Sequence, residues 1–205
     1  MFLPKIYPIT DTRLVNLSHA EQVERLSGGG AKLIQLREKY ASSKDFYEQA
    51  KDALEIARKY DVKIIINDRV DIALALKADG VHLGQDDISP AHARKILGEK
   101  AIIGFSTHNL KQAIEAVKLP IDYVAIGPIF ATKTKENPDA IVGVEGIRKV
   151  REAIGDFPLV AIGGISLGNF REVLNAGANS VAIIGDLLSE ADNITEKFVA
   201  FHNLC

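Results

Sequence analysis

Short apolar runs alternate with longer segments of helical periodicity along almost the whole chain. The runs are continuously apolar, as in Ile64-Ile65-Ile66 and Val181-Ala182-Ile183-Ile184, which is typical of parallel strands buried on both faces. We predict eight such strands: Ile6 to Thr10, Leu33 to Leu36, Lys63 to Asn67, Gly80 to Leu83, Ala101 to Phe105, Tyr123 to Gly127, Leu159 to Ile162 and Ser180 to Ile184.

The segments between these strands predict amphipathic helices. From Ser43 to Tyr60, apolar residues recur at spacings of three and four with charged residues between them, which predicts a surface helix with one inward face. Helix starts are also recognisable. Ser89 followed by Pro90 indicates an N-cap with proline at the first helical position, and Asn109 and Ser166 are candidate N-caps for other helices.

Eight strand and helix units without a linker favour an α/β fold of the (β/α)8 TIM-barrel class, with residues 1–205 as a single domain. A (β/α)8 barrel usually has about 250 residues, so the predicted barrel is compact. A doubly wound open sheet is the structural alternative. The absence of a distinct second set of units favours the closed barrel.

Composition narrows the class of partner. The 205 residues are 47% hydrophobic and carry a net charge of −2 with scattered basic residues, so we expect no nucleic-acid partner, no membrane span and a small-molecule ligand. Cys205 is the single cysteine, which fits a reducing, cytoplasmic location. The sequence is also compatible with a homo-oligomer.

Polar residues and glycines follow nearly every predicted strand. In a barrel of this class the carboxyl ends of the strands meet at one rim, where the chemistry takes place. These residues are Asp11; Gln35, Arg37 and Lys39; Asn67 and Asp68; Gln85, Asp86 and Asp87; Ser106 and His108; Thr132, Thr134 and Lys135; Gly163 and Gly164; Gly185 and Asp186.

Gly163 and Gly164 lie between the seventh strand and its helix. Loops after strands seven and eight of such barrels often bind phosphate through backbone N–H groups and a helix N-terminus, and glycine lets the backbone approach the anion. An ordinary tight turn is the alternative for this pair.

The charged residues indicate a second anion site. Asp68 and Asp87 follow neighbouring strands, and magnesium is usually held by one or two carboxylates together with substrate phosphates. Arg37, Lys39 and Lys135 lie at the same predicted rim, so both signs of charge are explained by a magnesium-chelated diphosphate. As alternatives, Asp68 could cap the helix near Val70, and Asp86 or Asp87 could begin a turn.

The two histidines near the rim indicate no covalent catalysis. His82 lies inside the fourth strand, where a hydrogen-bonded packing role is expected, whereas His108 follows the fifth strand and could be catalytic. Neither has metal-ligand spacing, and the chain shows no Ser-His-Asp or Cys-His arrangement.

In order along the chain, five motifs resemble those of the thiamine-phosphate synthase family. They are Gln35-Leu36-Arg37-Glu38-Lys39, Ile66-Asn67-Asp68, His82-Leu83-Gly84-Gln85-Asp86-Asp87, Gly127-Pro128-Ile129-Phe130-Ala131-Thr132-Lys133-Thr134-Lys135 and Ala161-Ile162-Gly163-Gly164-Ile165. The resemblance implies a transferase on a (β/α)8 barrel. It would join hydroxymethylpyrimidine diphosphate to hydroxyethylthiazole phosphate, or its carboxylated form, and release pyrophosphate with Mg2+ as cofactor.

The resemblance also implies roles for individual residues. Gln35 would contact the pyrimidine, and Thr132 and Thr134 would line the thiazole side. Gly164 and the backbone of Ile184 and Gly185 would take the thiazole phosphate. Asp68 and Asp87 would bind magnesium, and the diphosphate would be held by Arg37, Lys39, Asn67, Ser106 and Lys135.

One position departs from the family pattern, and two other functions stay open. Family members often have serine where this chain has Gly185, which removes one hydroxyl donor from the phosphate site. The segment from Asn67 to Leu74 also resembles the thiazole tautomerases, isomerases that act on a carboxythiazole phosphate and need neither magnesium nor a diphosphate site. A non-catalytic barrel that binds thiamine precursors in a regulatory role is the third hypothesis.

Overall fold

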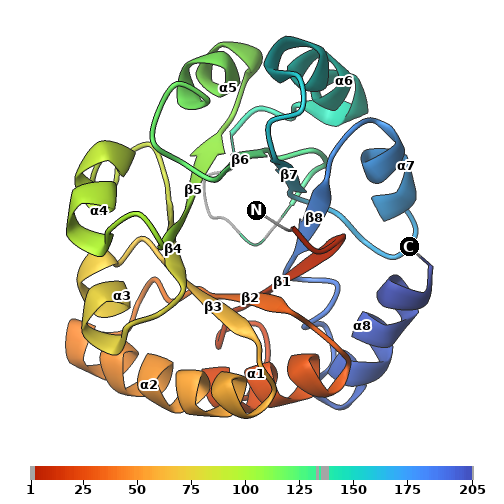
Figure 1. Cartoon of the computed structure of the whole chain (residues 1–205). Helices are drawn as coiled ribbons and strands as arrows, with labels where there is room; N and C mark the ends of the chain where they lie inside the picture. Colours follow the sequence, from red (N-terminus) through yellow and green to blue (C-terminus); the bar gives the residue numbers. More distant parts are fainter. Residues whose placement is uncertain (1–2, 133, 135–138, 205) are drawn as a thin grey trace.

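Eight parallel strands form a closed barrel in the order in which they occur along the chain, and β1 pairs with β8. The computed structural model describes residues 3–132, 134 and 139–204. Figure 1 shows the strands in the centre with the helices around them. The strands are β1 (Ile6–Thr10), β2 (Leu33–Leu36), β3 (Lys63–Asn67), β4 (Gly80–Leu83), β5 (Ile102–Thr107), β6 (Tyr123–Ile126), β7 (Leu159–Ile162) and β8 (Ser180–Ile183).

The predicted barrel class is confirmed, and the open sheet is excluded by the pairing of β1 with β8. The bounds of β1, β2, β3, β4 and β7 are those predicted. β5 was predicted wrongly. It begins one residue later and continues through Ser106 and Thr107, because both residues pair with β6. β6 and β8 each end one residue earlier than predicted, at Ile126 and Ile183.

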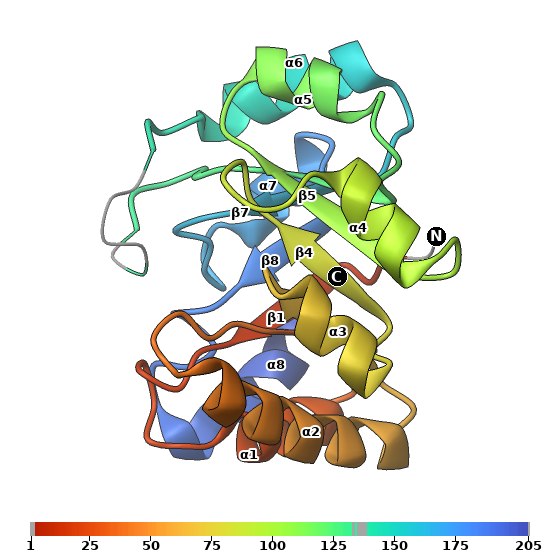
Figure 2. The same cartoon turned by 90° about the vertical axis from the view of Figure 1, so that its left-hand side faces the viewer.

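The helices pack outside the barrel (Figure 2). The predicted amphipathic helix is α2, whose inward face buries Phe46, Ala50, Ala53, Leu54 and Ala57. The helices are α1 (His19–Gly28), α2 (Ser43–Lys59), α3 (Val70–Leu76), α4 (Pro90–Leu97), α5 (Leu110–Ala116), α6 (Gly143–Ile154), α7 (Phe170–Asn175) and α8 (Ile194–Asn203), with a 3-10 turn, η1 (Ala191–Asn193), before α8. No helix in the described part of the chain has the length and hydrophobicity needed to span a bilayer.

Two of the three predicted helix caps are confirmed. The Ser89 side chain accepts a hydrogen bond from the His92 N–H with Pro90 at the first helical position, and Asn109 caps α5 in the same way. The prediction for Ser166 was wrong. α7 begins only at Phe170, and the Ser166 N–H instead donates to Oδ1 of Asn169 in the preceding turn.

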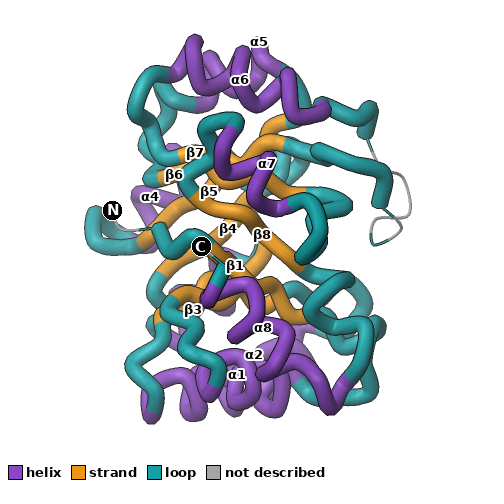
Figure 3. The backbone as a smooth tube through the Cα atoms, turned by 90° about the vertical axis from the view of Figure 1, so that its right-hand side faces the viewer, coloured by secondary structure: helices purple, strands orange, loops and turns teal. Residues whose placement is uncertain are grey.

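Two apolar layers stabilise the fold. One lies between the barrel and the helices, and the strands in Figure 3 are accordingly enclosed by helices. The other fills the barrel interior and includes Tyr7, Leu33 and Tyr123. Because side chains alternate along a strand, Ile34 and Leu36 of β2 face the helices while Leu33 faces the interior. The same alternation turns Gln35 towards the interior.

Candidate active site

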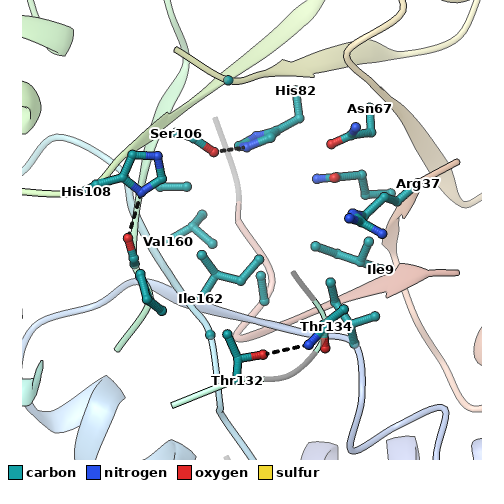
Figure 4. A pocket seen from close by; sticks show the side chains of 18 of the residues that line it. Ile9, Arg37, Asn67, His82, Ser106, His108, Thr132, Thr134, Val160 and Ile162 are labelled. Atoms are coloured by element: carbon teal, nitrogen blue, oxygen red, sulfur yellow. Dashed lines mark hydrogen bonds between the residues drawn. The ribbon is translucent and has the colours of Figure 1, made fainter. Parts of the chain in front are cut away.

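A cavity of about 830 Å³ opens at the C-terminal ends of the strands. In Figure 4, Arg37 and Asn67 lie on one side of it, and Ser106 and His108 lie on the opposite side. The predicted site residues that line the cavity are Gln35, Arg37, Lys39, Asn67, Asp68, Asp87, Ser106, Thr132, Thr134, Gly164, Ile184 and Gly185. Lys135 lies outside the described residues.

The inward-facing residues of β2 and of the loop after it lead from the barrel interior into this cavity. Leu33 is part of the apolar interior, Gln35 lines the cavity floor, and Arg37 and Lys39 follow the end of the strand at the rim. The two cations therefore do not lie within the buried strand, although they continue its inward face.

Both cations are held by carboxylates. Arg37 pairs with Asp11, which is only 3% exposed and also accepts a hydrogen bond from the Arg13 N–H at 3.0 Å. Lys39 pairs with Asp68. These ion pairs fix the positions of two positive groups around one space, which is the arrangement that a polyanion requires.

Asp68 and Asp87 lie beside each other at the rim. The pKa of Asp87 is raised, mainly because burial desolvates the carboxylate, and further because the negative charge of Asp68 lies close by. Asp68 has a φ of 61°, in the left-handed region, and its N–H donates to the His82 carbonyl at 2.8 Å. The two carboxylates lie next to each other at the cavity rim, each positioned by its own turn.

The structure also tests the purely structural roles that were considered for Asp68 and Asp87. Arg69 occupies the N-cap position of α3 without a side-chain cap hydrogen bond, so a capping role for Asp68 is not found. Asp87 does close a turn, because its Oδ2 accepts the Gly84 N–H at 2.7 Å. The Asp87 carboxylate also contacts the Asp68 side chain.

A chain of polar side chains crosses the cavity floor. Nε2 of Gln35 donates to the Tyr7 hydroxyl at 3.1 Å, which contacts the Tyr123 hydroxyl at 3.1 Å. The Tyr123 hydroxyl contacts Nδ1 of His82 at 2.9 Å, and Nε2 of His82 contacts Oγ of Ser106 at 2.8 Å. The hydrogen-bonded role predicted for His82 is confirmed.

The sequence pattern did not reveal Tyr7 and Tyr123 as site residues. Both lie at the start of strands that were interpreted as apolar throughout, and both side chains are almost fully buried. Their one signal is a polar atom at the tip of a large side chain, since a buried tyrosine hydroxyl usually needs a hydrogen-bond partner.

Two further cavity residues, His108 and Asn67, differ in whether their side-chain nitrogens have a hydrogen-bond partner. Nδ1 of His108 lies 2.8 Å from the Gly127 carbonyl, to which it donates, so this ring is held against the loop that follows β6. Asn67 is 6% exposed, and its Nδ2 is buried without a hydrogen-bond partner among the described residues. An unpaired buried donor that lines a cavity is satisfied when an acceptor binds there.

The opposite side of the cavity is built from backbone. Gly163 and Gly164 have φ values of 103° and 65°, and a Cβ would lie 2.6 Å from Cα of Pro128 or 2.5 Å from the Ala131 carbonyl oxygen, respectively. Both positions therefore require glycine. In the hydrogen bonds between described residues, the N–H groups of Gly164, Ile165 and Gly185 donate to no acceptor.

Comparison with known proteins identifies the family to which the chain belongs. The family model described as thiamine monophosphate synthase matches residues 6–187. A thiamine-phosphate synthase of Clostridium novyi (strain NT) is 47% identical over 189 residues, which cover 92% of each chain. The thiamine-phosphate synthase of Chloroflexus aurantiacus is 43% identical over 93% of this chain and 88% of its own. The chain belongs to the thiamine-phosphate synthase family.

A solved structure supports the same assignment. Thiamine phosphate pyrophosphorylase from Pyrococcus furiosus superposes with a TM-score of 0.87 at 37% identity, covering 98% of this chain and 94% of that one. The predicted thiamine-phosphate synthase resemblance and the transferase class are thereby confirmed. Both of these relatives carry the synthase name.

The cavity of this thiamine-phosphate synthase family member has two different sides. We call the side with Asp68, Asp87 and the two cations the ionic side, and the side with Gly163 and Gly164 the backbone side. Among the described residues there is no cluster of three or more histidine, cysteine, aspartate or glutamate side chains that could enclose a metal ion. The neighbouring carboxylates of Asp68 and Asp87 could supply two ligands. Such a set suits an ion whose other ligands come from a substrate and water.

Proposed function

We propose that this enzyme joins hydroxymethylpyrimidine diphosphate to hydroxyethylthiazole phosphate, or to its carboxylated form, and gives thiamine phosphate and pyrophosphate. The observation that carries the proposal is the division of one cavity into two anion-binding sides. Arg37, Lys39 and two carboxylates lie at one rim, and backbone N–H groups without an acceptor among the described residues lie across from them. Two phosphorylated substrates account for both sides.

The ionic side is assigned to the diphosphate. Arg37, Lys39, Asn67, Ser106 and Lys135 would hold its oxygens; the unpaired Nδ2 of Asn67 supports this assignment. Asp68 and Asp87 would hold Mg2+. The pKa of Asp87 is raised mainly by burial and further by the negative charge of Asp68, and a bound cation would offset both effects. Magnesium supplies positive charge that stabilises the leaving diphosphate.

The backbone side is assigned to the thiazole phosphate. Gly164, Ile184 and Gly185 would donate backbone N–H groups, and Thr132 and Thr134 would line the thiazole. Gly185 lacks the hydroxyl that family members often have. Oγ1 of Thr134 lies 3.6 Å from the place where a Cβ at Gly185 would stand, so a threonine hydroxyl is available beside the same site.

The reaction needs no protein nucleophile. The bond between the pyrimidine methylene carbon and the diphosphate oxygen breaks, and the electron pair leaves with the diphosphate. The thiazole nitrogen then supplies the electron pair for the new carbon–nitrogen bond. The cations disperse the charge of the leaving group, while Gln35 and the two threonines would align the rings.

Location and assembly stay predictions. A cytoplasmic enzyme without a nucleic-acid partner is what composition and charge indicate. A homo-oligomer is compatible with the fold.

The deciding experiment is a product assay on the purified chain with both substrates, with and without magnesium. We expect thiamine phosphate and pyrophosphate in equal amounts only with the divalent cation. Asp87→Asn should shift the magnesium dependence to higher concentration, because one anionic ligand is lost. Asp79→Asn, at the other end of the barrel, is the matched control and should leave that dependence unchanged. Turnover of the carboxythiazole tautomer without any synthase product would contradict the proposal and favour the isomerase.

A further inference from the structure

One residue of the segment that carries both cations has no part in the reaction as described. Glu38 lies between Arg37 and Lys39 in the loop that joins β2 to α2. Arg37 and Lys39 line the cavity, whereas Glu38 is not among the residues that line it. The Glu38 side chain is nevertheless only 7% exposed, so its carboxylate is enclosed by protein outside the cavity.

Both oxygens of the Glu38 carboxylate accept hydrogen bonds. Oε1 accepts from the backbone N–H groups of Tyr40 and Ala41, at 2.8 and 3.1 Å. Oε2 accepts from the Thr12 hydroxyl at 3.0 Å. One side chain therefore closes the loop after β2 on itself and joins it to the loop after β1.

The ionised state of Glu38 fixes the direction of these bonds. Burial alone would raise the pKa of Glu38, but its three hydrogen bonds outweigh burial and hold the pKa below the usual value of a glutamate. An ionised carboxylate has no proton and can only accept, so the two amides and the hydroxyl are the donors.

Two successive pairs join the loops after β1 and β2. Asp11 binds Arg37 beside the cavity, and the next residue, Thr12, binds Glu38 outside it. The loop after β2 is thus held on both of its sides, one facing the cavity and the other facing the protein.

The turn that Glu38 closes contains Lys39. The Lys39 side chain is 42% exposed and reaches Asp68 from this turn. A long side chain on a loose loop loses more conformational freedom when it binds an anion than the same side chain on a fixed backbone does. Fixing the turn therefore reduces the cost of anion binding at this rim.

A second contact between the same two loops lies nearer the solvent. The guanidinium carbon of Arg13 lies 3.8 Å from the centroid of the Tyr40 ring, and Tyr40 is 57% exposed. An exposed cation–π contact contributes less than hydrogen bonds to a buried charged group. Glu38 is accordingly the stronger of the two connections.

We propose that Glu38 is a positioning residue, which fixes the loop after β2 so that Arg37 and Lys39 are presented to the cavity already arranged for a polyanion. The inference rests on the proposed function, in which these two cations hold the diphosphate. Glu38 acts on the ligand only through its neighbours in the chain.

This role differs in sign from a simple effect of charge. By Coulomb's law, removing a negative charge beside two cations strengthens the binding of an anion. Loss of a fixed loop weakens binding instead, because the cations must then be ordered when the ligand arrives. The direction of the change in affinity therefore separates the two roles.

The first test is hydrogen exchange at the Tyr40 and Ala41 amides of the ligand-free protein, followed by NMR. Both amides should be protected in the wild type and in Glu38→Gln, whose amide oxygen can accept the same two N–H groups. In Glu38→Ala they should exchange about tenfold faster or more. Equal exchange in all three proteins would overturn the proposal, and the measurement needs neither substrate nor turnover.

The second test is calorimetric binding of pyrophosphate in the presence of magnesium, expressed per folded molecule. Glu38→Ala should bind about tenfold more weakly than the wild type, and Glu38→Gln should stay within about threefold of it. Tighter binding in both variants would assign Glu38 to charge alone. Unchanged binding in Glu38→Ala with a lower free energy of unfolding would assign it to the fold alone. Either result would overturn the proposal.

Glu21→Ala is the matched control. Glu21 is also a carboxylate that accepts two local hydrogen bonds, from the N–H and the hydroxyl of Ser18 at 2.7 Å each, but it lies at the start of α1 and not beside the two cations. Its loss should leave pyrophosphate binding unchanged. An equal loss of binding in Glu21→Ala and Glu38→Ala would show a general effect of stability and overturn the proposal.

Failure of the proposed function would look different. A wild-type chain that binds no magnesium pyrophosphate would contradict the diphosphate assignment, and the exchange rates of the Tyr40 and Ala41 amides would still decide whether Glu38 holds the loop.

Discussion

The two ends of the barrel use polar residues in opposite ways. At the N-terminal end, Asp79, Asp122 and Asn179 each precede an even-numbered strand. Their side-chain oxygens accept the backbone N–H groups of Ile64 at 2.8 Å, Ile103 at 2.7 Å and Leu159 at 2.8 Å, near the start of the preceding strand. The same device thus recurs between β3 and β4, β5 and β6, and β7 and β8.

Two arginines reinforce this end of the molecule. Arg94 of α4 donates to the Ala101 carbonyl and to Oδ2 of Asp122, at 2.5 and 2.8 Å. Arg151 of α6 donates to the Gly177 carbonyl at 2.8 Å and to Oδ1 of Asn179 at 2.6 Å. Charged and polar groups at the N-terminal end therefore pair with backbone and with each other, which stabilises the fold.

At the C-terminal end, the polar groups leave bonding capacity for a ligand. Lys39 and Arg37 bind carboxylates at the rim of an open cavity, and Nδ2 of Asn67 has no partner among the described residues. The comparison teaches that residue type alone does not separate stabilising charges from binding charges. What separates them is whether the backbone of the same chain satisfies them.

The sharpest way to break this comparison is to remove a cation from the C-terminal rim. Lys39→Ala should lower kcat/KM by about 100-fold or more through lost stabilisation of the diphosphate. The free energy of unfolding should change by less than about 1 kcal/mol, because a partly exposed ion pair contributes little to stability. Steady-state kinetics and urea unfolding measure the two effects.

Arg37→Ala should also lower kcat/KM, but it should cost more stability than Lys39→Ala because it leaves the buried carboxylate of Asp11 without its cation. Lys63→Ala, on the exposed first residue of β3, should affect neither quantity. A large loss of stability with normal turnover in Lys39→Ala would assign this cation to the fold.

The reverse result is expected at the N-terminal end. Asp122→Ala leaves the Ile103 N–H without its acceptor and Arg94 without its carboxylate, so the free energy of unfolding should fall by about 2 kcal/mol. Thermal and urea unfolding check this loss, and turnover per folded molecule should stay the same. Asp122→Asn should lose less than Asp122→Ala, because Asn179 fills the equivalent place before β8 with an amide. A drop in turnover without a stability change would contradict the division between the two ends.

The smallest effect is expected on the outer surface. Arg148 and Glu145 form an ion pair of 3.0 Å one turn apart on α6, with side chains 58% and 65% exposed. Arg148→Ala should change the free energy of unfolding by less than about 0.5 kcal/mol and leave kcat/KM unaltered. Urea unfolding at low and high salt would detect a larger contribution, which would count against the weak-pair expectation.

The strands were predictable where both faces are buried, because hydrophobicity then marks their length. The end of β5 was not predicted, because its last two residues, Ser106 and Thr107, are polar although they pair with β6. The Thr107 hydroxyl donates to the Ala125 carbonyl at 2.8 Å. Ser166 looked like a cap from residue type, but several residues of turn separate it from α7.

The site was predictable as a set of residue types and not as a network. The strand ends bring the predicted residues that the structure describes, all but Lys135, to one cavity because a parallel barrel places all its carboxyl ends at one rim. The side chains with which the site residues pair were not predictable from the sequence. Asp11 binds Arg37, and Tyr7 meets Tyr123 across 116 positions of sequence, which no local pattern encodes.

The pairing of β1 with β8 has a consequence for self-association. A sheet that closes on itself leaves no edge strand among the described residues, so its backbone offers no template on which another chain could add a strand. In the part of the chain that the structure describes, the helices and loops around the barrel are therefore the surfaces through which copies of this enzyme could meet. Contacts of that kind can change in evolution by surface substitution, without disturbing the hydrogen-bonded wall that holds the cavity residues in place.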